Sequence, residues 1–319
     1  MNNEQWNEEA APVKRRRRWR RESNPLLIKE LRGRMRGARA FVVLTVYLLL
    51  LTCFTSIMYY YVYTASASGP GSAPQMAEVG KAVFASIVLI EIFLVAFITP
   101  AFTAGAISGE RERQTYEVLR TTLLPAHKLV GGKLASALTY VFLLILAAVP
   151  MESLAFVLGG VVVEELVLAL VILLVTAVAF AAVGLFFSSW LRTTLASTVL
   201  AYGAVLATMV GLPALLVLSS VVMEPLMSGY SSSPPSWIVQ AVLNYGLYLG
   251  VGLSPVTAAI LTETTLQEQN TIWFFWRDVD ATHRILIPSA WIVYTIGYLA
   301  LALVLLLLAI VRVRRQETQ

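Results

Sequence analysis

The sequence predicts an all-α polytopic membrane protein with six transmembrane helices. Of its 319 residues, 58% are hydrophobic and only 13% are charged, about half the charged fraction of a soluble domain. Several apolar runs exceed the roughly 20 residues that a helix needs to cross a bilayer. The single cysteine, Cys53, lies inside the first of these runs and has no second cysteine to pair with, so no redox assignment follows.

A polar and strongly basic segment precedes the first apolar run. We expect residues 1–23 to form a disordered basic tail, in which Lys14 to Arg21 hold seven positive charges in eight positions. Such a cluster suits nucleic acid, anionic lipid or a topogenic role. Trp19 favours a headgroup interface and membrane helices follow it, so the last two roles fit better. We therefore expect anionic lipid as a partner and no nucleic acid.

Residues 24–40 predict an amphipathic helix that lies in the membrane surface. Asn24 is a favourable N-cap and Pro25 suits the first helical position. Basic side chains cover most of the predicted helix, while one face is apolar, as is typical of interfacial helices. The apolar face consists of Leu27, Ile28, Leu31 and Met35.

Six apolar runs define a transmembrane domain over residues 41–311. Between the fifth and sixth runs, residues 223–286 are of mixed character and are expected outside the cytosol. Within them, residues 237–253 are apolar but short and glycine-rich, which indicates re-entrant or interfacial helices rather than a full span. The predicted spans are residues 41–63, 82–107, 134–158, 166–190, 195–222 and 287–311.

The basic residues set the orientation of these spans. With the amino terminus inside, twelve Lys and Arg residues lie in residues 1–40, five in 108–133, one at Arg192 and three in a cytosolic tail, residues 312–319. This asymmetry satisfies the positive-inside rule at every loop and places both termini in the cytosol. A seventh span at residues 237–253 would put the basic tail outside, so we reject it. The basic residues left outside are Lys81, Arg277 and Arg284.

Residues 105–133 carry the densest group of charges between two predicted spans. Eight charges in hydrocarbon would cost on the order of 20 kcal/mol, so this segment is expected to lie in water. Good helix formers from Glu110, the i,i+3 pair Glu117 and Arg120, and Pro125 as a stop predict a short helix across the ends of two spans. Its apolar stripe would consist of Tyr116, Leu119 and Leu123.

This segment resembles the cytosolic loop of ABC-2 type permeases, the membrane subunits of a class of ATP-binding-cassette transporters. That loop reads small–G–E–R–E–x–x–T–x–[DE]–x–L, then T–x–L–x–P and, shortly after, G–K–L. The chain has SGERERQTYEVL from Ser108 to Leu119, then Thr122 to Pro125 with Leu124 in place of the usual Ser, and Gly132-Lys133-Leu134. The family's N–P–x–L–x–K–E–L–R opening matches residues 24–32, so the resemblance covers nearly the whole chain.

The resemblance implies that residues 108–125 form a coupling helix seated in a groove of a separate ATPase subunit. ATP and Mg²⁺ would then be bound by that partner, and this chain would hold no cofactor and be no enzyme. Its own residues agree, because Gly132-Lys133 lacks the upstream glycine of a phosphate loop. The alternative is an ordinary charged cytosolic loop. The residues assigned to coupling are Gly109, Glu110, Arg111, Glu112, Arg113, Thr115, Tyr116, Glu117 and Leu119.

Metal and pathway sites are sparse. His127 and His283 fall on opposite sides of the predicted membrane, so no metal site is expected. Glu91 lies roughly 14 Å into the second span, where an acid either faces a pathway or hydrogen-bonds to a Ser or Thr of a neighbouring helix. Glu152, in the third span, is expected to be solvated or to stabilise a kink at Pro150. A kink at Pro100 would open the backbone toward a pathway, whose candidates are Glu91, Thr99 and Thr103.

Small residues recur every four positions in the fifth span, a spacing that permits close contact between helices. The spacing does not decide whether that contact lies within one protomer or between two. By resemblance, ABC-2 dimers meet along the first and fifth helices, which makes this stripe a candidate dimer interface. It consists of Gly203, Ala207 and Gly211.

These features predict the transmembrane permease subunit of an ATP-driven transporter, an exporter in a bacterial or archaeal plasma membrane. Two permease copies, identical or as a heterodimer, would pair with two ATPase subunits. One alternative is a secondary transporter or channel without an ATPase, which predicts inverted repeats and more buried ion pairs. Another is a membrane anchor of a complex that does not transport. The sequence does not name the substrate.

The charge asymmetry generates a topology prediction. Cysteines introduced at Ser72 and Ser232 should react with a membrane-impermeant maleimide added to intact cells, whereas a cysteine at Thr122 should not. Labelling of the Thr122 cysteine from outside would overturn the assignment of every span.

Overall fold

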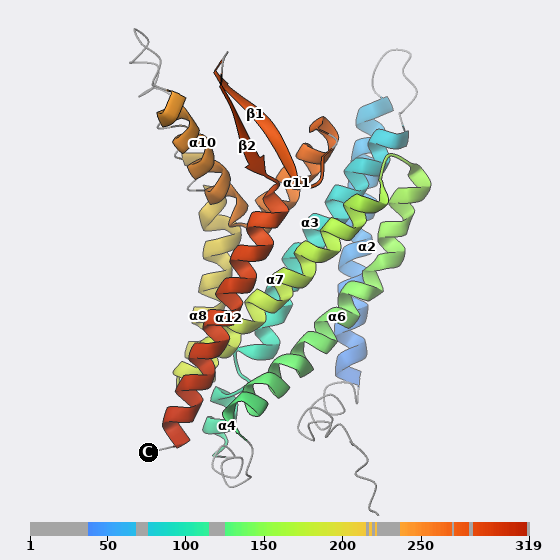
Figure 1. The fold of residues 1–319 in the computed structure, drawn as a ribbon. Coiled ribbons are helices and arrows are strands. Elements are labelled where there is room, and N and C mark those ends of the chain that lie inside the picture. Colours follow the sequence, from blue (N-terminus) through green and yellow to red (C-terminus); the bar gives the residue numbers. More distant parts are fainter. Residues whose placement is uncertain are drawn as a thin grey trace, which may run out of the picture.

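A computed structural model confirms the helical membrane fold. Among the residues that it describes, six helices are long and apolar enough to cross a membrane, and they run side by side in one bundle (Figure 1). The amphipathic segment at residues 24–40 and the basic tail before it lie almost wholly outside the described residues. The structure describes residues 38–67, 76–114, 125–214, 217, 218, 221, 237–269, 271–280 and 283–317.

Local sequence explains where the spans begin. The Glu165 side chain accepts a hydrogen bond from the backbone N–H of Val162 (3.2 Å) and so caps α7. Thr193 caps α8 in the reciprocal sense, because its hydroxyl at the N-cap accepts from the N–H of Ala196 (3.4 Å). The spans are α2 (Ala38–Ala67), α3 (Met76–Thr103), α6 (Ala126–Leu158), α7 (Val163–Trp190), α8 (Thr194–Leu206) and α12 (Ala290–Glu317); α8 continues into a π-helical turn, η1 (Ala207–Gly211).

Two predicted boundaries need correction. The second predicted span, residues 82–107, lies within the candidate span Met76–Glu112, in which α3 gives way to a turn after Thr103. The third span begins at Ala126 instead of residue 134, because Pro125 is its extended N-cap. The first turns of this helix contain Lys128 and Lys133, which precede the apolar run that defined the predicted span. The sixth span begins at Ala290 and not at residue 287, which lies in a strand.

The segment between the fifth and sixth spans holds structure that the hydropathy pattern does not reveal. Helices α10 (Trp237–Gly252) and α11 (Pro255–Gln269) follow one another with a bend of 120°, an arrangement consistent with the re-entrant alternative. An antiparallel hairpin then joins β1 (Phe274–Asp280) to β2 (His283–Pro288). Helices and hairpin gather at one end of the bundle (Figure 1).

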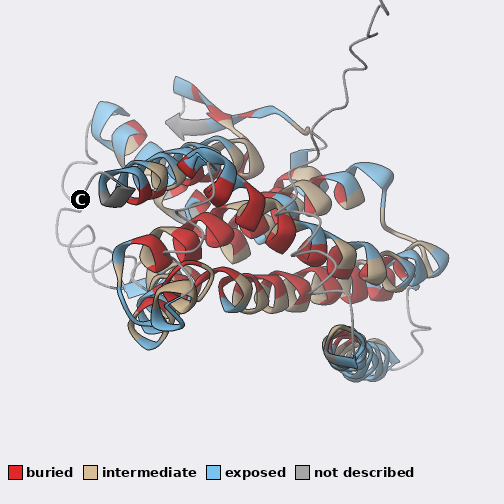
Figure 2. Cartoon of the chain, turned by 90° about the horizontal axis from the view of Figure 1, so that it is seen from below, coloured by how far each residue is buried: buried red, intermediate tan, exposed pale blue. Residues whose placement is uncertain are grey.

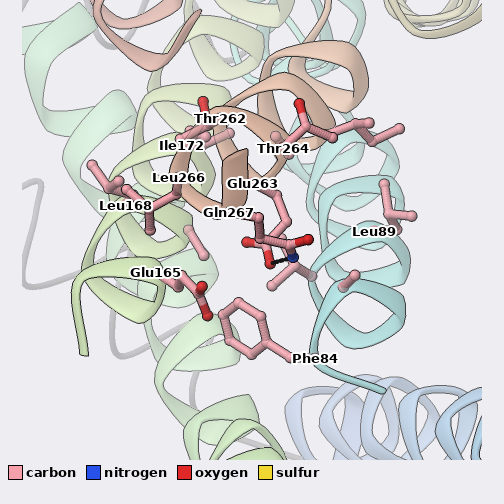
Figure 3. Close-up of a pocket in the computed structure, with 15 residues that line it drawn as sticks. Phe84, Leu89, Glu165, Leu168, Ile172, Thr262, Glu263, Thr264, Leu266 and Gln267 are labelled. Atoms are coloured by element: carbon pink, nitrogen blue, oxygen red, sulfur yellow. Dashed lines mark hydrogen bonds between the residues drawn. The ribbon is translucent and has the colours of Figure 1, made fainter. Parts of the chain in front are cut away.

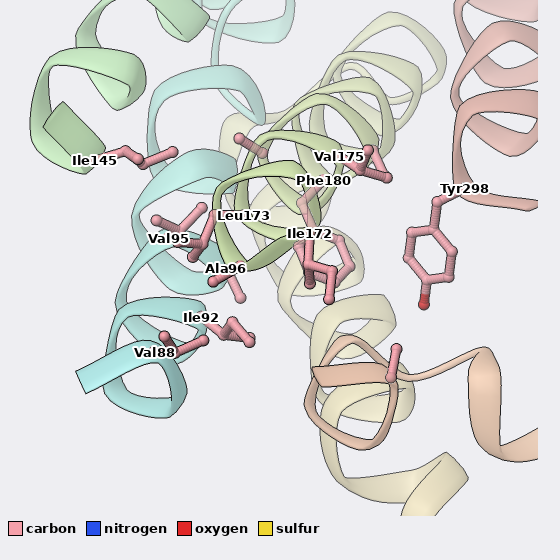
Figure 4. Close-up of a cluster of buried hydrophobic side chains, with 14 of the residues drawn as sticks. Val88, Ile92, Val95, Ala96, Ile145, Ile172, Leu173, Val175, Phe180 and Tyr298 are labelled. Atoms are coloured by element: carbon pink, nitrogen blue, oxygen red, sulfur yellow. The ribbon is translucent and has the colours of Figure 1, made fainter. Parts of the chain in front are cut away.

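Helix α7 forms the centre of the bundle. In its most apolar stretch 67% of the residues are buried, against 17% in α2, which stands at the edge (Figure 2). A large cluster joins Ile172, Leu173 and Phe180 of α7 to side chains of α3, α6 and α12 (Figure 4). Gly184 permits a close approach of α3, since a Cβ atom there would overlap the Thr103 hydroxyl.

Candidate functional site

The charged turn that the sequence singles out lies at the end of the bundle opposite the hairpin (Figure 1). After α3 ends at Thr103, residues 104–107 turn and a single helical turn, α4 (Ser108–Glu112), follows. Gln114 then adopts a left-handed backbone with φ of 56°, which ends the helix. The chain beyond it is not described until residue 125, so Thr115, Tyr116, Glu117 and Leu119 lie outside the described residues.

Buried hydroxyls fix the start of α4 against the ends of α7 and α8. The backbone N–H groups of Ile107 and Ser108 both donate to the Ser188 hydroxyl of α7 (2.8 and 3.0 Å). The Ser197 hydroxyl of α8 donates to the Ala104 carbonyl (2.7 Å) and lies 3.1 Å from the Ser108 hydroxyl. These bonds satisfy backbone groups that a chain reversal leaves without helical partners.

Consecutive charged residues of α4 contact three different helices. The Lys133 ammonium of α6 lies 3.4 Å from the Glu110 carboxylate. The Arg111 guanidinium donates to the carbonyls of Ser189 (3.0 Å) and Leu191 (3.2 Å), at the carboxyl end of α7. The Glu112 carboxylate accepts from the N–H and hydroxyl of Thr194 (2.8 and 2.7 Å), at the amino end of α8.

The contacts of Arg111 and Glu112 match the polarity of the helix ends that they meet. The carboxyl end of a helix exposes carbonyls and favours a cation, while the amino end exposes N–H groups and favours an anion. Arg111 and Glu112 therefore occupy the ends of α7 and α8 that suit their charges. The hydrogen bonds from Thr194 also lower the pKa of the exposed Glu112 carboxyl, so it stays ionised at neutral pH.

These contacts correct one expectation about the turn. We expected the whole charged segment to lie in water, but Lys133 is only 4% exposed inside α6 and contacts Glu110. Glu110, Arg111 and Glu112 all bind within the chain, whereas Arg113 is exposed. The sequence signal for these partners is the polarity of helix ends, which favours a cation at the end of α7 and an anion at the start of α8.

The intramembrane acids meet in the interior between α2, α3 and α6. Glu91 is fully buried and its Oε1 accepts a hydrogen bond from the Tyr47 hydroxyl of α2 (3.1 Å). Glu152 of α6 is only 1% exposed, which excludes the solvated alternative and leaves the role at the Pro150 kink, and its charge acts on Glu91. Among the described residues, Glu91 Oε2 and both Glu152 oxygens have no hydrogen-bond partner. Glu91 therefore forms a hydrogen bond to a neighbouring helix, as one of its two predicted roles requires, but the donor is a tyrosine instead of a serine or threonine.

The other predicted positions lie apart from these acids. The hydroxyls of Thr99 and Thr103 are buried and donate to carbonyls of their own helix, those of Val95 (2.6 Å) and Thr99 (3.1 Å). His127 is the second residue of α6 and His283 is the first of β2, at opposite ends of the bundle (Figure 1). Within the described part of the chain, no group of three His, Cys, Asp or Glu residues is placed to hold a metal ion.

The small-residue stripe faces away from its own protomer. Gly203 and Ala207 are exposed, and a Cβ atom added at Gly203 would meet nothing within 4 Å among the described residues. The π-helical turn η1 contains Ala207 and Gly211, an irregularity that the spacing gives no sign of. Such turns are common at functional positions.

A second feature that the sequence did not indicate lies toward the hairpin end of the bundle. A cavity of about 150 Å³, which we call the outer cavity, is formed by side chains of α3, α7 and α11 (Figure 3). Most of its wall is apolar, but Glu165 and Glu263 both point into it. Its residues come from three distant parts of the chain, so it leaves no local motif.

Comparison with known proteins covers almost the entire chain. A family model described as ABC-2 family transporter protein matches residues 25–317. No curated protein matches the chain. The matched range contains α4, all six spans and the hairpin.

The Tyr47–Glu91 bond generates a stability prediction. Tyr47→Phe removes the donor, so it should lower the free energy of unfolding by about 1 kcal/mol, the usual size of such bonds in membranes. Glu91→Gln keeps an oxygen that accepts from Tyr47, so it should be close to neutral. Unfolding of the purified variants in mixed micelles measures both. A larger loss for Glu91→Gln than for Tyr47→Phe would show that the carboxyl has another essential partner.

Proposed function

Because this chain belongs to the ABC-2 family of transporter proteins, we propose that it is the permease subunit of an ATP-driven exporter coupled through residues 108–125. The family is a membrane transport component of ABC transporters and implies association with an ABC ATPase subunit. The observation that carries the coupling proposal is the attachment of α4 to the ends of α6, α7 and α8.

Residues 108–125, which we call the coupling turn, divide into two parts with different roles. Glu110, Arg111 and Glu112 bind this chain's own helices and transmit displacement to them. Arg113 is exposed and, with residues 115–125, forms the part that contacts the ATPase. Tyr116 and Leu119 supply the apolar anchor of that contact, as their place on one stripe of the predicted helix suggests.

Transmission needs a rigid attachment, and the geometry supports one. A push on α4 acts on the carboxyl end of α7 through two hydrogen bonds from Arg111 and on the amino end of α8 through two bonds to Glu112. ATP and Mg²⁺ bind in the partner, whose closure moves α4 and switches access between the two faces of the membrane. Export is the direction that we propose.

The functional unit contains two permease copies that meet along α2 and the stripe on α8. Both helices expose large apolar side chains such as Val46, Leu49 and Val199, while Gly203 and Ala207 leave room for a close partner. A second identical copy is the simplest partner, and a related permease fits equally. The partner's helix would then cover the stripe, because small residues let the backbones of two transmembrane helices approach closely.

We place the chain in the plasma membrane of a bacterium or archaeon, and the charge distribution supports an orientation with both termini in the cytosol. The end of the bundle with α4 also contains Arg192 and the basic carboxyl end of α12, and we place it in the cytosol. The hairpin end then faces outside. The basic residues 14–21 bind anionic lipid on the cytosolic leaflet.

Separating transmission from docking tests the coupling proposal. Arg111→Ala with Glu112→Ala frees the ends of α7 and α8, so the ATPase should remain bound while the outer end no longer responds to ATP. Tyr116→Ala with Leu119→Ala should instead release the ATPase. Co-elution measures binding, and spin labels at the exposed positions Glu78 and Glu268 report the outer end as a distance change on trapping with ATP and vanadate.

Arg192→Ala is the matched control, because this exposed arginine lies in the same turn region without belonging to α4. It should keep both co-elution and the distance change. If the Arg111/Glu112 variant retains the full distance change, α4 does not transmit the motion. If Tyr116/Leu119 binds the ATPase normally, the anchor lies elsewhere and the ATPase-independent alternative gains support.

The dimer proposal predicts a large effect from bulk at the stripe. Gly203→Ile with Ala207→Ile should weaken self-association at least tenfold, because branched side chains hold the two backbones apart. Gly297→Ile on α12 is the control, since a Cβ atom there also meets nothing within 4 Å in the described structure. Single-molecule photobleaching in nanodiscs or liposomes at low protein density measures the dimer fraction. An unchanged fraction would move the seam away from α8.

A further inference from the structure

We propose that the outer cavity binds an amphiphile with a cationic head and an alkyl or aryl body. The inference rests on the proposed transport function in one respect: if the chain is a transporter, the amphiphile is its class of substrate. The binding itself follows from the wall of the cavity and from the two carboxylates that point into it (Figure 3).

The size and lining of the cavity suit an apolar body. Phe84 from α3 and Leu168 and Ile172 from α7 form much of the wall, and α11 closes the third side. At about 150 Å³ the space compares with apolar protein cavities that admit benzene. It therefore holds one ring or a short stretch of alkyl chain, while the rest of a larger molecule would extend beyond it.

The carboxylates select the head group. Glu165 and Glu263 line the same cavity, and the charge of Glu263 acts on Glu165. Each already accepts one hydrogen bond, from the N–H of Val162 (3.2 Å) and from the Gln267 amide (2.6 Å), which orients the carboxylates without neutralising them. Two neighbouring carboxyl groups at an apolar wall can accept hydrogen bonds from a cationic head group, whereas they disfavour phosphate or carboxylate head groups.

The other charges nearby leave the cavity mouth acidic. Lys81 and Glu164 also act on Glu165, so the local group contains three acids and one lysine. In the part of the chain that the structure describes, Lys81 forms no ion pair with either cavity carboxylate. One lysine therefore does not balance this group, and a ligand cation can supply the missing charge.

The depth of the residues fits the way an amphiphile lies in a leaflet. Glu165 is in the first turn of α7, whereas Ile172 lies seven residues further, roughly 10 Å deeper along the helix. The acidic mouth is thus near the outer membrane surface and the apolar floor lies toward the hydrocarbon. A head at the interface with its body directed inward matches both ends.

Three probes with one body and different heads test the proposal. Octylammonium, octanol and octanoate are titrated by calorimetry into permease in phosphatidylcholine nanodiscs, with empty nanodiscs subtracted. We expect octylammonium to bind at least tenfold more tightly than octanol, and octanoate to bind weakest. Equal affinities for octylammonium and octanol would overturn the assignment of the head group.

Variants locate the binding in the outer cavity. Glu165→Gln with Glu263→Gln should reduce the preference for octylammonium over octanol to less than threefold, whereas Glu268→Gln, an exposed residue of α11 outside the cavity, should leave it unchanged. Ala259→Phe fills the cavity from α11 and should weaken the binding of octylammonium and of octanol at least tenfold. If that variant is unstable, Ala169→Leu fills the cavity from α7 and should have the same effect. A preference that survives the double substitution, or affinities that survive both fillings, would refute the site.

The ATPase is absent from this experiment, which keeps it separate from the coupling test. Failure of the probes to bind removes the proposed ligand class and leaves the coupling results standing. Loss of coupling in the α4 variants, or its absence in the wild type, leaves the cavity measurements equally interpretable.

Discussion

The structure depends on how two helix ends are satisfied where they meet. Helix α7 ends at Trp190 and α8 begins at Thr194, so unpaired carbonyls and unpaired N–H groups lie within a few residues of each other. In α4, Arg111 and Glu112 present a cation to the first set and an anion to the second. Neighbouring residues of opposite charge thereby fit neighbouring helix ends of opposite polarity. This pairing fixes the turn that joins the second and third spans to the centre of the bundle.

That attachment explains why α7 can be the central helix. Its length is rich in small residues, and Gly184 lets α3 approach until a methyl group would collide with Thr103. Four residues later Ser188 accepts two backbone hydrogen bonds from the turn that follows α3. One face of α7 therefore provides close packing at Gly184 and, one turn later, hydrogen bonds to the backbone at Ser188. The position of α4 follows from the packing of α3 on α7 as much as from its own charges.

The fold class, the six spans and the location of the charged turn could be predicted from the sequence, because hydropathy, charge asymmetry and a motif are local properties. The partners of the turn could not, since Ser189 and Thr194 have no local mark of their role and the match arises only when the helix ends meet. The hairpin was missed because its buried residues, Phe275, Ile285 and Ile287, gain their apolar environment from distant helices. The burial of Glu152 was not predicted for the same reason: its place in the third span said nothing of the interior beside Tyr47 and Glu91.

The two sites lie at opposite ends of the same pair of helices, and this arrangement limits how they can communicate. Helix α7, about 42 Å long, carries the carbonyls that Arg111 binds at one end and Glu165 at the other. Helix α3 likewise supplies Phe84 to the outer cavity and leads directly into α4. The third wall, α11, follows α10 and precedes the hairpin, at the end of the bundle opposite α4 (Figure 1). A rigid displacement of α3 and α7 would therefore change the cavity by moving two of its walls against the third. Since packed helices shift as bodies and do not deform continuously, a displacement of α4 would reach the outer cavity through α3 and α7, the two helices that connect the sites.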